Sequence, residues 1–175
     1  ELAGKTVGVY GCGAIGMKFA EICKAFDMRV LATKRSKISG IENGIEFTTP
    51  EELIAKSDYI SFHCPLTDET RGMVDRRFIS KIKDGAVLIN TSRGAVFNES
   101  DVADALKSGK LSGVGADVLS VEPADPANPL LSAPNAVITP HCAWTSKEAR
   151  LRLMDILDKN LDSFVKNGCG LNRVF

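Results

Sequence analysis

Three glycines that follow an apolar run are spaced G-x-G-x-x-G, at Gly11, Gly13 and Gly16. In such a loop the first glycine permits a tight turn, and the second lets a pyrophosphate approach a backbone that has no Cβ. The third lets the next helix pack close to the strand. The phosphates then lie against unpaired N–H groups at the positive end of the helix dipole. The spacing also fits a glycine-rich turn without a ligand, so the flanking elements decide its meaning. Apolar residues at helical spacing follow directly: Ile15, Phe19, Ile22, Cys23 and Phe26. This context favours a dinucleotide site.

Three polar residues far apart in the chain, Arg93, Glu122 and His141, suggest a reaction when they are taken together. An arginine fork binds a carboxylate through two parallel hydrogen bonds. A histidine donates and accepts a proton near neutral pH, and a glutamate beside it orients the ring and favours its protonated form. Opposite a nicotinamide, this set would bind a 2-oxo acid, protonate its carbonyl oxygen and let a hydride reach the carbon. Each residue alone also fits a structural role, as a surface cation, a loop charge or a polar residue near a helix.

Positioning these residues requires strands that alternate with helices. Apolar runs bounded by turn residues predict strands over 5–10, 29–33, 58–62, 86–89, 114–118 and 136–138. Helical spacing and capping residues predict helices over 14–26, from 49, over 75–82, from 98 to about 109, and from about 146 to 166. This alternation predicts βαβ units with right-handed crossovers. The expected fold class is α/β, a Rossmann-type doubly wound parallel sheet with three α/β/α layers.

Polar segments at the ends of the predicted strands are expected to meet at one edge of the sheet. Ligands of open parallel sheets bind outside the carboxyl ends of the strands. Four strands end in Gly11-Cys12-Gly13, His63-Cys64-Pro65, Thr91-Ser92-Arg93-Gly94 and Thr139-Pro140-His141. Glu122 follows a fifth strand by a few residues. A shared edge favours one catalytic site over three separate structural roles.

The composition argues against several other classes of function. Lys plus Arg and Asp plus Glu both number 22 in 175 residues, so the net charge is zero and nothing suggests a nucleic-acid surface. No apolar run is long enough to span a membrane, and no signal peptide is visible. The five cysteines are odd in number and scattered, which is typical of a reducing cytoplasm without a disulfide framework.

Two other kinds of site are not favoured. The His63-Cys64 and His141-Cys142 pairs could suggest a metal, but their ligands come from distant strand ends and no C-x-x-C pair anchors a site. No metal is therefore predicted. A Cys64 nucleophile activated by His63 is also disfavoured, because adjacent strand residues point to opposite faces.

Five stretches of the sequence resemble the nucleotide-binding domain of the D-isomer-specific 2-hydroxyacid dehydrogenases. They follow the family's order over almost the whole chain: Gly11-Cys12-Gly13-Ala14-Ile15-Gly16, His63-Cys64-Pro65-Leu66-Thr67, Leu88-Ile89-Asn90-Thr91-Ser92-Arg93-Gly94, Gly115-Ala116-Asp117-Val118 and Thr139-Pro140-His141. The resemblance implies an NAD(P)-dependent oxidoreductase. By it, Arg93 binds the carboxylate and carbonyl of the substrate, His141 is the acid/base, and Glu122 is the partner of His141.

The motif and the resemblance together assign the cofactor-binding residues. In chain order they are Gly11, Gly13, Ala14, Ile15, Gly16, Lys34, Arg35, His63, Cys64, Pro65, Thr70, Thr91, Ser92, Asp117 and Ala143. By resemblance, Asp117 contacts the nicotinamide end. The chain departs from the family at Lys34, which stands where the family has an Asp that binds the ribose. An acid would repel the 2′-phosphate of NADP, whereas Thr33-Lys34-Arg35-Ser36 offers two cations and two hydroxyls, so NADP is predicted to be favoured.

Within the family, three segments look most like the glycerate dehydrogenases, also called hydroxypyruvate reductases. They are Leu119-Ser120-Val121-Glu122-Pro123, Asn128-Pro129-Leu130-Leu131 and His141-Cys142-Ala143-Trp144. The expected substrate is a small 2-oxo or 2-hydroxy acid of the hydroxypyruvate/D-glycerate or glyoxylate class. The family's first segment, which forms most of the substrate lobe, does not precede Glu1 here. Residues 1–175 are therefore expected to form one NAD(P)-binding domain, with 146–175 as its C-terminal helix and tail, and to be inactive alone.

Two classes of function remain open. One is the oxidoreductase, and the other is a non-catalytic dinucleotide-binding sensor or assembly module. The intact set of Arg93, Glu122 and His141 favours the enzyme, because a sensor needs no proton donor. Relatives dimerise through this domain, so the resemblance implies a homodimer. The expected location is the cytoplasm, with neither nucleic acid nor membrane as a partner.

Overall fold

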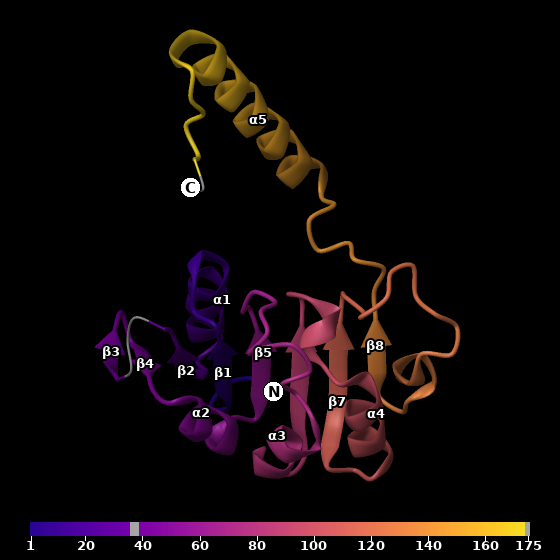
Figure 1. Ribbon diagram of the computed structural model, residues 1–175. Coiled ribbons are helices and arrows are strands. Elements are labelled where there is room, and N and C mark those ends of the chain that lie inside the picture. The colour runs from indigo at the N-terminus through magenta and orange to yellow at the C-terminus, as the bar shows by residue number, and fades with distance from the viewer. Residues whose placement is uncertain (36–38, 174–175) are drawn as a thin grey trace. The chain divides into compact units, whose positions relative to one another are not determined.

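The computed structural model describes residues 1–35 and 39–173, and the chain forms two compact units, Glu1–Pro140 and His141–Phe175. The first unit contains an eight-stranded sheet with helices, and the second contains one long helix (Figure 1). Of the residues considered above, Ser36 and the last two residues of the tail lie outside the described part.

A single sheet organises the first unit, in the order β3-β4-β2-β1-β5-β6-β7-β8. Its neighbouring strands are parallel, except that β3 is antiparallel to β4. The strands are β1 (Thr6–Tyr10), β2 (Arg29–Thr33), β3 (Gly40–Glu42), β4 (Ile45–Phe47), β5 (Tyr59–Phe62), β6 (Ala86–Asn90), β7 (Leu111–Ala116) and β8 (Ala136–Ile138). The chain builds outward from β1 in one direction, then crosses to β5 and builds in the other. The doubly wound fold is confirmed, and the reversal between β1 and β5 is where such sheets bind ligands.

Two details of the sheet differ from the sequence prediction. β7 begins at Leu111, which pairs with Ala86, and it ends at Ala116, so Asp117 follows the strand and lies at its carboxyl end. The β3–β4 hairpin is missing from the prediction. Its turn, Asn43-Gly44, has φ of 52° and 72°, which is typical of an Asn-Gly hairpin turn. Strands of three residues are too short for a clear alternation, and β4 is held in the sheet by its pairing with β2.

Hydrophobic cores lie on both faces of the sheet, and β2 shows the alternation that builds them. Val30 and Ala32 belong to the core shared with α1 (Ala14–Ala25), whereas Leu31 belongs to the core shared with α2 (Pro50–Lys56), α3 (Arg76–Lys81) and α4 (Glu99–Lys107). Two short 3₁₀ turns, η1 (Gly94–Val96) and η2 (Pro129–Ser132), complete the first unit. The three predicted α/β/α layers are therefore present.

Capping residues mark most helix starts where the sequence predicts them. Thr49, Asp75 and Asn98 each accept a hydrogen bond from the backbone N–H three residues further on. These bonds satisfy N–H groups that have no partner within the helix. At the far end of α1, Asp27 has a φ of 57°, the left-handed conformation expected there.

Only part of the apolar stripe that predicts α1 is buried: Cys23 lies in the core and Phe19 packs against it. Three of its residues are more than half exposed, namely Ile15, Ile22 and Phe26. The buried residues are Gly16, Ala20 and Cys23. A Cβ at Gly16 would lie 2.7 Å from the carbonyl oxygen of Gly11, so the helix approaches the glycine loop closely and small residues fit on that side.

The second unit is built on α5 (Lys147–Asn167), close to the range predicted. Ser146 caps its start by accepting from the N–H of Ala149, and Gly168 ends it with a left-handed φ of 73°. The tail then returns along the helix, because the N–H of Asn172 donates to the side chain of Asn160 at 2.9 Å. In the part of the chain that the structure describes, no helix is both long and apolar enough to cross a membrane.

Candidate functional site

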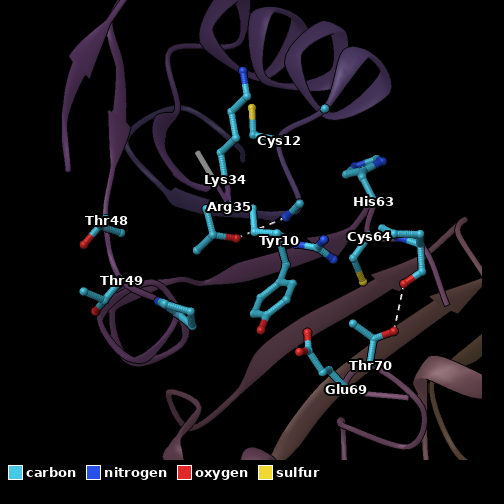
Figure 2. Close-up of a pocket in the computed structure, with 15 residues that line it drawn as sticks. Tyr10, Cys12, Lys34, Arg35, Thr48, Thr49, His63, Cys64, Glu69 and Thr70 are labelled. Carbon is cyan, nitrogen blue, oxygen red and sulfur yellow. Dashed lines mark hydrogen bonds between the residues drawn. The ribbon is translucent and has the colours of Figure 1, made fainter. Parts of the chain in front are cut away.

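Two cavities at the carboxyl ends of the central strands join into one cleft. A cavity of about 600 Å³ reaches from the glycine loop to the segments that follow β2, β4 and β5 (Figure 2). A second, of about 430 Å³, continues past β5 to the loop after β6. His63, Cys64 and Pro65 line both cavities. The cleft therefore crosses the point between β1 and β5 where the strand order reverses. Because it extends from the segment after β4 to the loop after β6, it can hold an extended two-part ligand.

The glycines of the loop have the separate roles that the motif predicts. Gly11 has a φ of 94°, and a Cβ there would lie 2.8 Å from the backbone nitrogen of Cys64. A Cβ at Gly13 would meet no protein atom within 4 Å, so this backbone is open on the side where a ligand approaches. Gly16 brings α1 close to the loop, as described above. The backbone of the loop thus fits a pyrophosphate.

The start of α1 provides a second indication of an anion site. Thr49, Asp75, Asn98 and Ser146 cap the other α-helices in the described part of the chain. At α1 the N-cap is Gly13, and no side chain accepts from the first turn. These N–H groups, at the positive end of a helix of 12 residues, suit a phosphate.

Cations line the cavity where β2 ends. Lys34 and Arg35 are exposed and line the first cavity, as Figure 2 shows. The structure gives less support to the prediction that hydroxyls help to bind the 2′-phosphate. The hydroxyl of Thr33 already accepts from the N–H of Gly11 at 3.1 Å, and Ser36 lies outside the described residues. Thr33 thus holds the glycine loop against β2, and the two cations remain to attract a phosphate.

Burial sets the ionisation of the uncharged groups in the cleft. It lowers the pKa of His63, whose Nε2 lies 2.9 Å from the hydroxyl of Ser61, so the imidazole is neutral at neutral pH. It raises the pKa of the Cys64 thiol and of the Tyr10 hydroxyl, and the nearby Cys64 and Glu51 raise the latter further. It also raises the pKa of Cys12, which Lys34 partly opposes. Buried thiols held in this form are poor nucleophiles.

The loop that carries Arg93 is shaped by a fully buried amide. The side chain of Asn90, at the end of β6, donates to the carbonyl of Arg93 at 3.0 Å. Its oxygen accepts from both the N–H and the hydroxyl of Ser92, at 3.0 and 2.9 Å. Arg93 itself is exposed and lines the second cavity, where Nη1 donates to the carbonyl of Ser92 at 2.7 Å. The guanidinium is therefore presented at the mouth of the cleft.

The loop after β7 carries Glu122. Its Oε1 accepts from the N–H of Leu119 at 3.0 Å, which closes a short turn. Two neighbouring strand ends are tied together by Asp117, whose N–H donates to the carbonyl of Asn90 at 3.0 Å. Oδ1 of Asp117 accepts from the hydroxyl of Thr139 at 2.5 Å. Asp117 is buried and holds these strand ends in place beside the loop of Arg93.

The structure brings most of the predicted site residues to one cleft. The residues that line it are Gly11, Gly13, Ile15, Lys34, Arg35, His63, Cys64, Pro65, Thr70, Thr91, Ser92 and Arg93. Ala14 and Gly16 lie at the start of α1, and Asp117 follows β7. Glu122 belongs to the first unit, whereas His141, with a φ of 51°, and Ala143 belong to the second.

Several residues that line the cleft are missing from the prediction. They are Tyr10, Cys12, Thr48, Thr49, Pro50, Leu66 and Glu69. In Figure 2 Tyr10 lies between the Thr48–Thr49 segment and the Glu69–Thr70 segment. Thr48 and Thr49 follow β4, so the sequence signal for them is the Asn43-Gly44 hairpin turn that precedes that strand.

The cysteines and acidic residues of the described chain form no metal site. No group of three or more His, Cys, Asp or Glu side chains in the described residues is arranged to hold a metal ion. None of the cysteines in this part of the chain forms a disulfide. His63 is oriented by Ser61 rather than by the thiol next to it in the chain.

A family model described as the NAD binding domain of D-isomer specific 2-hydroxyacid dehydrogenase matches residues 1–143. The hydroxypyruvate reductase of Blautia hydrogenotrophica is 46% identical over 167 residues, which is 95% of this chain and 52% of the relative. The chain thus spans about half the length of the curated relatives that it matches.

Solved structures share the fold at high similarity. An acyclic imino acid reductase, Bsp5, in complex with NADPH and D-Arg, has a TM-score of 0.90 and 36% identity, covering 100% of this chain and 55% of the other. The NAD-dependent formate dehydrogenase of Staphylococcus aureus in complex with NAD has a TM-score of 0.87 and 31% identity, covering 94% and 50%. Both dinucleotides therefore occur among similar structures.

Proposed function

Because this chain belongs to the D-isomer-specific 2-hydroxyacid dehydrogenases, through their NAD-binding domain, we propose that it is the dinucleotide-binding part of an enzyme that reduces a small 2-oxo acid. The substrate is of the hydroxypyruvate/D-glycerate or glyoxylate class. One observation carries the proposal: a single cleft links Arg93 to the glycine loop and to the N-terminus of α1, which no side chain caps. A similar protein that is named hydroxypyruvate reductase supports the substrate class.

The chain's own residues would hold the dinucleotide along this cleft. The N–H groups at the start of α1 bind the pyrophosphate beside the open backbone of Gly13. The adenosine half lies toward Lys34, and the nicotinamide half lies toward Thr91 and Arg93, because those residues line opposite ends of the cleft. When bound, the dinucleotide supplies the hydride.

Two residues act on the substrate in this proposal, and a third acts through one of them. Arg93 holds the carboxylate through its planar fork, which fixes the direction in which the carbonyl points. His141 donates a proton to the carbonyl oxygen as the alcohol forms. Glu122 stabilises the protonated imidazole and orients it. Exclusion of water by a second, substrate-binding lobe would strengthen each of these interactions.

The proposed cofactor is NAD(P), with NADP favoured. Lys34 and Arg35 both line the first cavity, and in the family the position of Lys34 carries an acid that would repel a 2′-phosphate. Glu69 also lines this cavity, so the preference depends on the two cations being nearer to the phosphate than this carboxylate is.

The remaining parts of the proposal concern the whole protein. Residues 1–175 form one NAD(P)-binding domain, to which 146–175 contribute the last helix and the tail. The domain forms a homodimer, as the family resemblance suggests. Its location is the cytoplasm, which is consistent with five cysteines that form no disulfide in the described chain.

A binding experiment on the 175-residue chain tests the cofactor site. NADPH and NADH are titrated separately, and nicotinamide fluorescence gives each dissociation constant. We expect saturable binding of both, with NADPH bound more tightly. Gly13→Val should abolish binding of both without unfolding the chain, because its side chain enters open space that the pyrophosphate needs. Gly115→Ala is the matched control, since a Cβ there also meets nothing within 4 Å.

The outcomes separate the parts of the proposal. Tighter binding of NADH would contradict the NADP preference alone. If the wild-type chain bound neither dinucleotide, or if Gly13→Val bound them as well as the wild type, the cofactor site itself would be wrong.

A further inference from the structure

The loop that carries Arg93 and the loop that carries Glu122 are in contact through their backbones. A Cβ built on Gly94, the residue after Arg93, would lie 1.9 Å from the carbonyl carbon of Leu119. It would also lie 2.1 Å from the carbonyl oxygen of Leu119 and 2.4 Å from the nitrogen of Ser120. Each distance is far below any ordinary contact, and the atoms concerned belong to backbone that cannot rotate away. Among the glycines of residues 1–35 and 44–173, no other meets so close an obstacle.

The requirement at Gly94 is for space and not for backbone conformation. Gly94 does not have a positive φ, so its backbone is outside the left-handed region that favours glycine. It begins η1, and the N–H of Phe97 donates to its carbonyl at 2.9 Å. Gly94 is also buried. A side chain at this position therefore has no exit, and the two loops would have to separate.

The segment that Gly94 touches is also anchored by α4. Oε1 of Glu99 accepts from the N–H of Ser120 at 2.7 Å, and Oε2 accepts from the hydroxyl of Ser120 at 2.6 Å. Oε2 also accepts from the side-chain amide of Asn128, a buried residue, at 2.8 Å. One carboxylate thus ties both ends of the loop after β7 to the first turn of α4.

The segment before Gly94 is anchored as well. The buried amide of Asn90 holds the carbonyl of Arg93, and Glu122 closes a turn onto the N–H of Leu119. The two loops therefore form one braced unit. Arg93 precedes the contact by one residue, and Glu122 follows it by two or three.

We propose that Gly94 is a positioning residue, which sets the spacing between Arg93 and the loop of Glu122 by allowing the two backbones to touch. Glu99 completes the arrangement by holding Ser120 against Gly94. This inference rests on the proposed function, because it assigns Arg93 to the substrate carboxylate and Glu122 to the acid/base pair. Gly94 itself contacts neither substrate nor cofactor.

A methyl group added at Gly94 should push the two loops apart and slow the reaction. For Gly94→Ala, the carbonyl carbon of Leu119 must move from 1.9 Å to at least the 3.4 Å of ordinary contact, which displaces the loops by about 1.5 Å. Misplacement of a binding group by about 1 Å costs on the order of 10²-fold in rate. We therefore expect kcat/KM for the 2-oxo acid to fall about 10²-fold, with both a higher KM and a lower kcat.

The experiment uses the intact enzyme, in which a substrate lobe accompanies this chain, and the 175-residue chain for binding and stability. Gly94→Ala is compared with the wild type and with Gly115→Ala, a glycine-to-alanine change that meets nothing within 4 Å. Glu99→Gln is the second variant. It adds no bulk, and it removes one of the two acceptor oxygens, so a smaller loss of kcat/KM, about tenfold, is expected.

The readouts separate positioning from general damage. The dissociation constants for NADPH and NADH should change far less than kcat/KM in every variant, because the glycine loop and Lys34, which hold the pyrophosphate and the adenosine half, lie in the other cavity. Steady-state kinetics should show the loss confined to kcat and to KM for the 2-oxo acid. If Gly94→Ala fails to fold, Glu99→Gln still tests the inference. This variant should fold, because Glu99 is partly exposed at the start of a helix.

Three outcomes would overturn the inference. One is wild-type kinetics in both Gly94→Ala and Glu99→Gln. Another is an equal loss in Gly115→Ala. The third is a loss of dinucleotide binding that matches the loss of kcat/KM, which would indicate general disruption. A wild-type enzyme without reductase activity would instead contradict the proposed function, and this outcome is distinguishable because it appears before any variant is made.

Discussion

Arg93 shows how a single residue can be held and still be available. Its guanidinium donates once to the carbonyl of Ser92, at 2.7 Å, and it lies exposed at the second cavity. A guanidinium has five N–H donors in a planar fork, so the other donors can form the two parallel bonds that a carboxylate accepts. The bond to Ser92 reduces the freedom of the long side chain before the substrate arrives, which lowers the entropy lost on binding.

The proposed pairing of Glu122 with His141 leads to a prediction at this scale. In the intact enzyme, Glu122→Gln should move the pH profile of 2-oxo acid reduction toward lower pH, because the neutral amide no longer favours protonated His141. His141→Asn should lower kcat on the order of 10²–10⁴-fold through loss of the proton donor. The rate of reduction is measured across the pH range by the loss of nicotinamide absorbance.

A control for this prediction lies in the same loop. Asp125 accepts from the N–H of Ala127 at 2.9 Å and is exposed, so Asp125→Asn should leave the pH profile in place. A Glu122→Gln profile that overlies that of the wild type would show that Glu122 and His141 are not paired.

At the scale of elements, the sheet is braced at the edge opposite the cleft. Asp58, just before β5, accepts from the N–H of Thr6 at 2.8 Å and from Nζ of Lys83 at 2.6 Å. It thus ties the starts of β1 and β5 to the turn before β6. The hydrogen bond from Lys83, followed by that from Thr6, lowers the pKa of Asp58 below its ordinary value of 3.8. The charged carboxylate is therefore the form that stabilises the fold.

This brace predicts both a stability loss and its pH dependence. Asp58→Asn should reduce the free energy of unfolding by about 1–3 kcal/mol at neutral pH, since a charge-assisted bond in a partly buried site is lost. A lowered pKa in the folded state gives stabilisation that is present above the pKa of the unfolded state and disappears as the pH falls through the folded pKa. The difference between the variant and the wild type should therefore shrink well below pH 3.8.

Urea unfolding at neutral and acidic pH measures this difference. Asp84→Asn is the control, because Asp84 is 89% exposed and its pair with Lys110 should contribute little, within about 0.5 kcal/mol. An equal effect from both variants, or an Asp58→Asn difference that persists in acid, would show that Asp58 is not the brace.

At the scale of the whole molecule, the cleft runs along one edge of the sheet, at the carboxyl ends of the strands. Its two cavities are lined from β1, β2, β4, β5 and β6, all within the first unit, whereas His141 belongs to the second. Hydride transfer and proton donation are both strengthened when water is excluded and the substrate is held in line. Cofactor binding and catalysis therefore place different demands on the molecule, and the first unit meets the demands of cofactor binding.

The 175-residue chain should accordingly bind the dinucleotide and fail to turn over substrate. Without a second lobe, Arg93 and His141 would work in water and a bound oxo acid would lack half of its contacts. The chain is mixed with NADPH or NADH and with hydroxypyruvate or glyoxylate, and the absorbance of the reduced nicotinamide is followed. Turnover from about 1 per second upward, which is ordinary for enzymes, would show that a substrate lobe is dispensable.

Much of the fold and part of the site were determined by local sequence. The glycine spacing, the caps at Thr49, Asp75 and Asn98, and the apolar strands act through neighbouring residues, so their physics is visible without the rest of the chain. The order of strands and helices then required a doubly wound sheet, and the carboxyl ends of its strands were bound to carry the ligand-binding residues. The cleft from Gly13 to Arg93 follows from these two facts.

Only the tertiary structure decided what depends on segments that are distant in the chain. It buried Gly16, Ala20 and Cys23 of α1 instead of the larger residues, because the helix lies so close to the glycine loop. It brought Thr48 and Thr49 into the first cavity, because β4 is a strand only through pairing with β2. It placed Gly94 against Leu119, a contact across 25 residues that no local pattern encodes, since steric fit depends on where two backbones meet in space.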